Sequence, residues 1–410
     1  MTAQMCSNTV SKRKYSSTNI ANDQNLHDSI QCNPKQCFLF DPMTHPTHMQ
    51  LLSAKSTVLY VVLGSIIQMT LIGIGIDCMQ YGVSALNIEN ALFIIQVIVY
   101  YVINIIASHL SMTCPRLAFI LFHISLVIPL TLPTRRSVYR YILVSGYTLS
   151  SLRWVELLKR HHQWNGWYRC LLTMSFCDIR YCEVLVLPMT HQRRETMLTK
   201  WKQLVCNALL WISIHSVLIG VLIVILLYLS ALLKYEKLNV ITFLVLMAFR
   251  YSLDFVTVVE SFSAIHYAYI LMFSVLGVKA QCIQNAPLHA ASVSELWSTR
   301  WNRYIQPLLH NHIYTPVYNR TNNRQLAVLT TFMFSGVWLH GLPAYIAGLT
   351  LKRALSIELF FVAQALLIAI EERLFIRPIA NTFHTRTRTK ILMLITLPLL
   401  FEPLHTLFQI

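Results

Sequence analysis

A histidine lies inside an apolar segment near the end of the chain. His340 follows Trp338 and precedes Gly341, within the run from Val328 to Leu351. An ionisable side chain is costly in such a segment unless another group satisfies it, and residues of this kind are functional candidates. A neutral imidazole can take a proton from an alcohol near neutral pH, so His340 is a candidate general base. The alternative interpretation is a histidine that is hydrogen-bonded to a neighbouring helix.

The polar segment 279–327 carries a second set of candidate residues. Ser292 and Glu295 have the spacing of a capping box, which predicts a helix that begins near residue 293. Pro307 cannot continue a helix, so we expect this one to end at about residue 306. The segment is therefore predicted to place a short helix between two apolar spans.

This predicted helix combines tryptophan with arginine. On a regular helix Trp297, Arg300, Trp301 and Tyr304 share one face, and Asn302 lies on another. One interpretation is an anchor at the membrane interface, where such side chains gather. The other is a helix that lies against an acyl chain and its head group, with the Asn302 amide orienting the substrate or binding an oxyanion.

Other ionisable residues in apolar runs suggest less. His215 lies in the long run from Leu204 to Leu233 without a nearby cluster of polar residues that could form a site, so we expect a packing role. Arg250 and Asp254 are four residues apart, so they share a helix face and could pair.

The composition indicates a membrane protein. Of 410 residues, 55% are apolar and 12% are charged, against about 25% charged in a typical soluble domain. This excludes an ordinary soluble enzyme, a disordered protein and a fibrous protein. About 20 apolar residues cross a bilayer, and ten runs approach or exceed that length. They are 57–76, 91–107, 117–132, 138–158, 204–233, 238–259, 262–278, 328–351, 355–370 and 391–408. We expect an all-α, polytopic transmembrane bundle of about eight to ten spans.

The chain divides into three parts by composition. Residues 1–55 are polar and are predicted to form a disordered tail. Residues 56–278 carry the first spans, interrupted by a predicted loop at 159–202, and 279–410 form the region with the candidate site. The net charge of +16 comes largely from basic clusters between spans. This pattern is typical of loops that face anionic lipid, and nucleic acid is not expected as a partner. The cysteines lack zinc spacing, so no metal is expected.

Two motifs resemble the wax synthase branch of the membrane-bound O-acyltransferases. Residues 297–302 read Trp-Ser-Thr-Arg-Trp-Asn, and 334–340 read Phe-Ser-Gly-Val-Trp-Leu-His. That branch has Phe-Trp-Gly-Arg-Arg-Trp-(Asn/His), followed by Ser-Gly-x-x-His. Residues 360–364, 369–371 and 398–403 are similar to its later spans, and the resemblance covers about 260–410.

The chain departs from this pattern in its spacing. Leu296 replaces the usual Phe, and Ser298-Thr299 replace Gly-Arg. His340 lies five residues after Ser335, where the family has four. On a regular α-helix one extra residue turns a side chain by about 100°. A π-bulge would absorb the extra residue.

The resemblance implies a reaction and a set of roles. An acyl group would pass from acyl-CoA to the hydroxyl of a lipophilic alcohol, without a further cofactor, in a membrane that we expect to be the endoplasmic reticulum. A long-chain fatty alcohol, giving a wax ester, is favoured; a sterol, a terpenoid or diacylglycerol is an alternative acceptor. The implied site consists of His340 as base, Asn302 at the oxyanion or thioester, Arg300 and Arg303 at the CoA phosphates, and Trp297, Trp301 and Trp338 as tunnel walls.

Three alternatives remain open on sequence alone. The two arginines could form a solvated basic face. The protein could be a polytopic lipid carrier or transporter, although the sequence has no matching pair of broken spans. It could also be an inactive member of the family, because of the position of His340. The oligomeric state is not predicted.

Overall fold

The chain is helical in the residues that the structure describes. The computed structural model describes residues 55–81, 88–132, 137–160, 166, 169–170, 173, 183–184, 191–235, 238–274, 278–280, 282–374 and 383–408. Apart from one pair of two-residue strands, β1 (Glu183–Val184) and β2 (Val278–Lys279), their regular structure is helix, which confirms the all-α class. The predicted tail lies outside the described residues except for Lys55, the first residue of α2.

Aromatic rings fill the core between the first helices. These are α2 (Lys55–Tyr81), α3 (Ile88–Leu110), α4 (Pro115–Ile124), α5 (Val127–Leu130) and α6 (Ser137–Arg160). Phe93 of α3 stacks on Tyr139 of α6 with ring centroids 4.0 Å apart, and Phe122 of α4 stacks on Tyr147 of α6 at 5.0 Å. These rings are buried, so α6 packs against both α3 and α4 in this part of the hydrophobic core.

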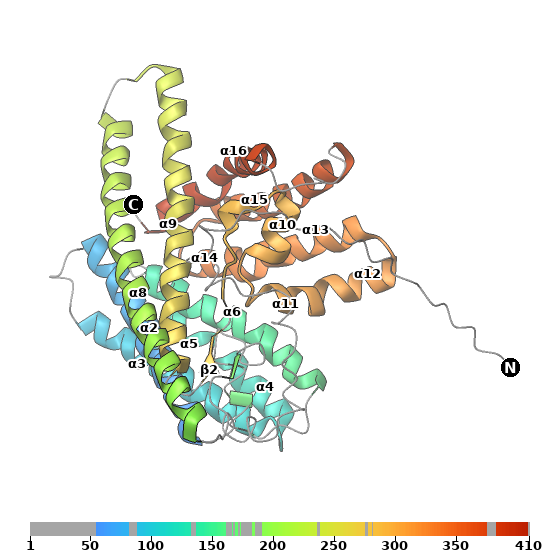
Figure 1. Ribbon diagram of the computed structural model, residues 1–410. Helices are drawn as coiled ribbons and strands as arrows, with labels where there is room; N and C mark the ends of the chain where they lie inside the picture. Colours follow the sequence, from blue (N-terminus) through green and yellow to red (C-terminus); the bar gives the residue numbers. More distant parts are fainter. Residues whose placement is uncertain are drawn as a thin grey trace, which may run out of the picture. The chain divides into compact units, whose positions relative to one another are not determined.

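Two long helices form an antiparallel hairpin. They are α8 (His191–Tyr235) and α9 (Val240–Ser274), which pack along each other (Figure 1). Two predictions are wrong here. The expected loop 159–202 is too long, because α8 begins at His191, and the two spans expected at 238–259 and 262–278 are one continuous helix.

The polar residues at and just after the expected break, within residues 260–263, do not interrupt α9. Ser261 and Ser263 donate their hydroxyls to the carbonyls of Thr257 and Val259, four residues back. Glu260 pairs with a histidine of α8. These bonds satisfy the polar side chains locally. A short dip in hydrophobicity along the sequence is therefore compatible with an unbroken helix.

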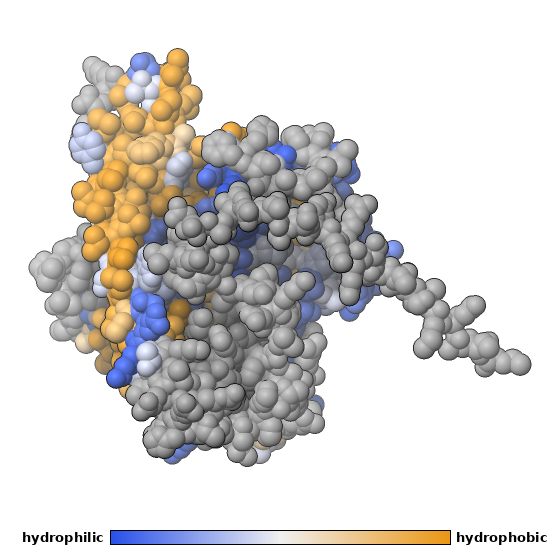
Figure 2. Space-filling model, in the orientation of Figure 1, coloured by the Kyte–Doolittle hydropathy of each residue, from blue (hydrophilic) through white to orange (hydrophobic). Residues whose placement is uncertain are grey.

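Five helices of the described residues are long and apolar enough to cross a membrane. They are Asn90–Leu110, Trp201–Lys234, Val240–Ser274, Arg324–Ile346 and Leu351–Arg373. Figure 2 shows hydrophobic side chains gathered over the α8–α9 hairpin, where Val224, Ile241 and Leu244 are well exposed. An apolar surface of this extent suits contact with lipid.

Short helices and three π-helical turns make up the region before the last two long helices. They are η4 (Pro287–His289), α10 (Val293–Glu295), η5 (Leu296–Arg300), α11 (Gln306–Leu309), η6 (His310–Tyr314), α12 (Thr315–Thr321), α13 (Arg324–Phe334), η7 (Ser335–Gly341) and α14 (Leu342–Ile346). The π-helical turns are η5, η6 and η7. The next helix, α15 (Leu351–Leu374), packs against α13, η7 and α16 (Phe383–Phe408).

A polar cluster joins α9 to α16. The Arg250 guanidinium donates to His405 Nδ1 at 3.0 Å, and His405 Nε2 lies 3.1 Å from the Asp254 carboxylate. The Tyr251 hydroxyl donates to Glu402 of α16. Arg250 and Asp254 do share a helix face, as the sequence predicts, and both of them contact the same imidazole of another helix.

Candidate active site

The helix that carries His340 contains a π-helical turn. α13 gives way at Ser335 to η7, which spans Ser335–Gly341, and the chain returns to α-helix in α14. In a π-helix each residue bonds to the one five positions away. The π-bulge that could absorb the extra residue is therefore present, and His340 Nδ1 meets the Ser335 carbonyl although it lies five residues further along the chain.

The imidazole of His340 is held in one tautomer. Its Nδ1 lies 3.0 Å from the carbonyl oxygen of Ser335. A carbonyl only accepts hydrogen bonds, so Nδ1 carries the proton and the lone pair of the neutral ring is on Nε2. Nε2 is therefore the atom that could accept a proton from a substrate.

Phe361 of α15 connects His340 with the tryptophan segment. Its ring lies 4.5 Å from the His340 ring and 6.2 Å from Trp297, centroid to centroid. The Trp297 indole N–H donates to Gln364 at 3.2 Å, and Gln364 donates in turn to Thr396 of α16 at 2.8 Å. Both predicted motifs thus meet the same stretch of α15.

The predicted helix from 293 to 306 begins as expected and ends early. Ser292 accepts from the backbone N–H of Glu295 at 2.9 Å, and the Glu295 carboxylate accepts from that of Ala291 at 2.7 Å, so the capping interaction is confirmed. The helix, however, ends at Arg300, and Pro307 lies in the first turn of α11. Proline is tolerated there because a first-turn N–H has no partner in the helix.

Asn302 forms the turn between the two helices. Its φ of 34° lies in the left-handed region, which asparagine tolerates better than most residues. Its carbonyl accepts from the backbone N–H groups of Ile305 and Gln306, at 3.0 and 3.1 Å. The backbone of Asn302 therefore has a structural role, and the role of its amide in catalysis stays a prediction.

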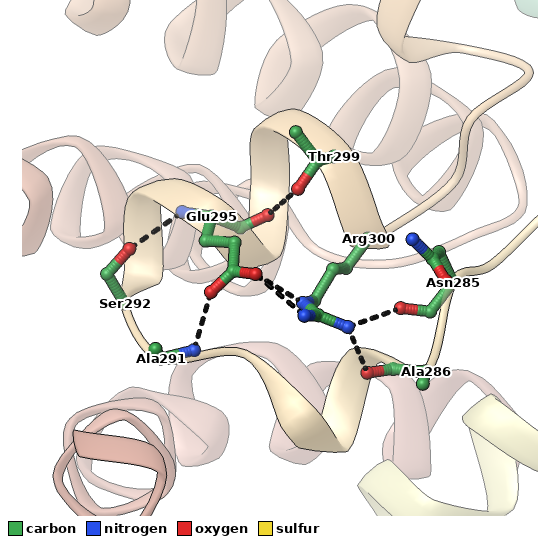
Figure 3. A network of polar contacts seen from close by, with 7 residues as sticks. All are labelled: Asn285, Ala286, Ala291, Ser292, Glu295, Thr299 and Arg300. Carbon is green, nitrogen blue, oxygen red and sulfur yellow. Dashed lines mark hydrogen bonds and ion pairs between the residues drawn. The ribbon is translucent and has the colours of Figure 1, made fainter. Parts of the chain in front are cut away.

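Arg300 holds the preceding loop together (Figure 3). Its guanidinium contacts the Glu295 carboxylate at 2.7 Å and donates to the carbonyls of Asn285 and Ala286 at 3.0 and 3.3 Å. These bonds use donors that would otherwise reach a phosphate. Arg303 contributes its backbone N–H, which donates to Ile283 at 2.7 Å.

We expect Arg300→Ala to lower the stability of the protein and to raise its KM for acyl-CoA only slightly. Loss of this partly exposed pair and of two backbone bonds should reduce the free energy of unfolding by about 1–2 kcal/mol. Thermal unfolding of the detergent-solubilised protein measures the effect, with Arg303→Ala as the matched control because that change keeps the backbone N–H. An unchanged melting temperature with a strongly raised KM for acyl-CoA would instead make phosphate binding the main role of Arg300.

Basic residues of α16 approach the same loop. Glu371 accepts from the backbone N–H of Val293 at 2.8 Å and lies 3.6 Å from Arg388. The pKa of His289 is lowered from its ordinary value by burial and then by the charges of Arg386, Arg300 and Lys390. Arg386 and Lys390 belong to one of the basic clusters between spans, which the sequence assigns to a loop that faces anionic lipid and that also suits an anionic cosubstrate, and the fold brings them near His289.

Two of the three predicted wall tryptophans lie together. The rings of Trp297 and Trp301 are 5.8 Å apart, and Trp301 stacks on Phe255 of α9 at 5.5 Å. Trp338 instead donates its indole N–H to Ser151 of α6 at 2.8 Å. It thus packs on a different part of the core, and a wall shared by all three tryptophans stays a prediction.

His215 has a partner that the sequence did not indicate. Its Nδ1 lies 2.5 Å from the Glu260 carboxylate of α9, and its ring stacks on Tyr267 at 5.5 Å. The partner is 45 residues away along the chain, so only the pairing of α8 with α9 reveals it. The packing role expected for His215 extends to a polar contact between the two helices.

Comparison with known proteins supports one family for the segment that carries the site. Residues 281–363 match the family model described as Membrane bound O-acyl transferase family. The match is a similarity of this segment, 83 of the 410 residues, to the family. It includes Trp297, Asn302 and His340 and extends to Phe361. No curated protein matches the chain significantly. Together with the five apolar helices, the match supports an integral membrane protein, and it suggests acyltransferase activity for the matched segment.

Proposed function

We propose that this protein transfers an acyl group from acyl-CoA to the hydroxyl of a lipophilic alcohol. The observation that carries the proposal is the family match over 281–363, which covers both the tryptophan motif and His340. The π-helical turn supports it, because it compensates for the extra residue between Ser335 and His340. This also weakens the argument for an inactive family member.

The geometry of His340 suggests a direct transfer. Nε2 would take the proton from the alcohol as its oxygen attacks the thioester carbonyl. The carbon–oxygen bond forms, the carbon–sulfur bond breaks, and the imidazolium returns the proton to the departing thiolate. The Asn302 amide is proposed to orient the thioester or to stabilise the oxyanion.

The basic residues beside the site suit an anionic cosubstrate. Acyl-CoA carries phosphates, and Arg386 and Lys390 lie close enough to His289 to influence its pKa. Arg300 contacts Glu295, and we propose that Arg303, Arg386 and Lys390 contribute to phosphate binding together with it.

Both lipophilic substrates would reach the site from the bilayer. We favour a long-chain fatty alcohol as acceptor, with a wax ester as product, and we propose the endoplasmic reticulum as the location. A sterol, a terpenoid or diacylglycerol is the alternative acceptor. A lipid carrier is the alternative function, but a carrier requires no proton acceptor with a fixed tautomer.

Acyl transfer in microsomes tests the proposal. Membranes from a host without neutral-lipid synthesis would receive labelled palmitoyl-CoA with hexadecanol, a sterol or diacylglycerol in separate reactions. We expect labelled wax ester with hexadecanol. Ester with another acceptor would keep the reaction and change the substrate. Correctly inserted protein that gives no ester with any acceptor would contradict the proposed function.

A further inference from the structure

A carboxyl group of α15 lies buried beside the π-helical turn. Both oxygens of Glu358 are buried, and among the described residues neither has a hydrogen-bond partner. The helix that carries Glu358 is one of the five candidate membrane spans. Buried polar atoms are nearly always hydrogen-bonded, and an ionisable residue within a span usually has a functional role.

The missing side chain of Gly336 makes room for this carboxyl. A Cβ at Gly336 would lie 2.2 Å from Glu358 Oε2 and 3.1 Å from the Cβ of Phe361. A contact of 2.2 Å is impossible, so any larger residue at 336 would displace the carboxyl. The sequence thus combines a glycine in η7 with an acidic residue that would otherwise have no space.

The Glu358 carboxyl approaches the same turn, η7, that carries His340. Gly336 is one position after Ser335, whose carbonyl receives the His340 Nδ1–H. Phe361 lies near both groups: its ring is 4.5 Å from the His340 ring, and its Cβ and Glu358 Oε2 are each within 3.1 Å of the place that a Cβ of Gly336 would take. The Glu358 carboxyl therefore lies beside the turn that carries the proposed base, His340.

We propose that Glu358 binds the hydroxyl of the acceptor together with His340. A carboxyl without a counter-charge is stable in an apolar setting as the uncharged acid, which can both donate and accept a hydrogen bond. A hydroxyl has one proton and two lone pairs. His340 Nε2 would accept the proton, Glu358 would donate to one lone pair, and the second lone pair would remain free to attack.

This inference rests on the proposed function. It adds that Glu358 determines which chemical class of acceptor the site binds. A thiol of equal length offers a sulfur that accepts hydrogen bonds only weakly. The site should therefore prefer an alcohol over the matching thiol, and the preference should depend on Glu358. Glu358 is half-buried as a residue, so rotation of its side chain can present the carboxyl to a bound hydroxyl.

Equilibrium binding of labelled hexadecanol to the purified protein, with unlabelled hexadecanethiol as competitor, tests the proposal without acyl-CoA. We expect the wild type to bind the alcohol about tenfold more tightly than the thiol, the effect of about one hydrogen bond. Glu358→Leu should bind both equally. Glu358→Gln, which also donates and accepts, should keep part of the preference.

Substitution of the glycine gives an independent test. Gly336→Ala should reduce the preference by displacing the carboxyl, and it should have no further effect when combined with Glu358→Leu. Gly220→Ala is the matched control, because a Cβ there meets nothing within 4 Å.

An unchanged preference in Glu358→Leu, or no preference in the wild type, would overturn the inference. Because the binding assay needs no turnover, a protein that prefers the alcohol but forms no ester would contradict the proposed function alone.

Discussion

Replacement of His340 by asparagine should abolish ester formation while the fold persists. Loss of a general base typically lowers the rate by about 100- to 10,000-fold. The asparagine amide can occupy the place of Nδ1 and keep the hydrogen bond to the Ser335 carbonyl. It has no basic nitrogen in the place of Nε2. We expect the initial rate with palmitoyl-CoA and hexadecanol to fall by this factor, as measured by labelled ester.

The control for this variant is its thermal stability. His340→Asn keeps the Ser335 bond, so its melting temperature should stay near that of the wild type, and His340→Ala should melt at a lower temperature. Ester formation by His340→Asn at a rate within a few-fold of the wild type would show that the base is another residue. His215, paired with Glu260, would then be the next histidine to substitute.

The activity should depend on the number of residues in the π-helical turn. Insertion of one residue should lower the activity about as much as loss of the base, whereas deletion of one residue should have a small effect. Deletion of Val337, an exposed residue, would place His340 four residues after Ser335. The turn could then close as regular α-helix with the histidine in the same position. Insertion of one alanine after Val337 would place it six residues away, and neither helix type aligns that spacing.

We expect the deletion variant to keep activity within about tenfold of the wild type and the insertion variant to lose about 100-fold or more, since small misplacements of a catalytic group have large effects. Initial rates of ester formation, with thermal unfolding as the control for folding, measure both. A deletion that inactivates the folded protein as fully as the insertion would contradict the interpretation that η7 accommodates one extra residue.

The sequence predicted the class of the fold well and its boundaries less well. A long apolar run in a bilayer must satisfy its own backbone hydrogen bonds, and a helix does so. The all-α class could therefore be predicted from the sequence. The boundaries within α9 were not, because Ser261, Ser263 and Glu260 resemble a loop by composition. Their bonds to the preceding turn and to His215 depend on a completed helix and its neighbour.

The candidate site shows the same division between local and non-local signals. The cap at Ser292 is local, and spacing indicated it; the π-helical turn before His340 was suggested by comparing the spacing of Ser335 and His340 with the family pattern. The early end of the helix at Arg300 was missed because Asn302 carries no strong break signal. Two backbone hydrogen bonds support the left-handed turn there: the N–H of Asn285 donates to Arg300, and the N–H of Arg303 donates to Ile283.

Glu358 was not singled out by its position in the sequence. A single acidic residue in an apolar run has no motif around it, and Gly336 lies 22 residues before it. Only the packing of α15 against η7 brings the carboxyl to the glycine, and in the part of the chain that the structure describes the carboxyl has no hydrogen-bond partner. The same is true of Arg386 and Lys390, whose approach to His289 follows from the position of α16.

A single-turnover reaction of the purified protein tests the central claim most directly. The wild type and His340→Asn would each be mixed with labelled palmitoyl-CoA, with and without hexadecanol. The label would then be measured in ester, free acid and protein. We predict that it enters ester in the wild type only when the alcohol is present, and that no label remains on the protein. Label attached to the protein, or equal ester in both proteins, would contradict direct acyl transfer with His340 as the base.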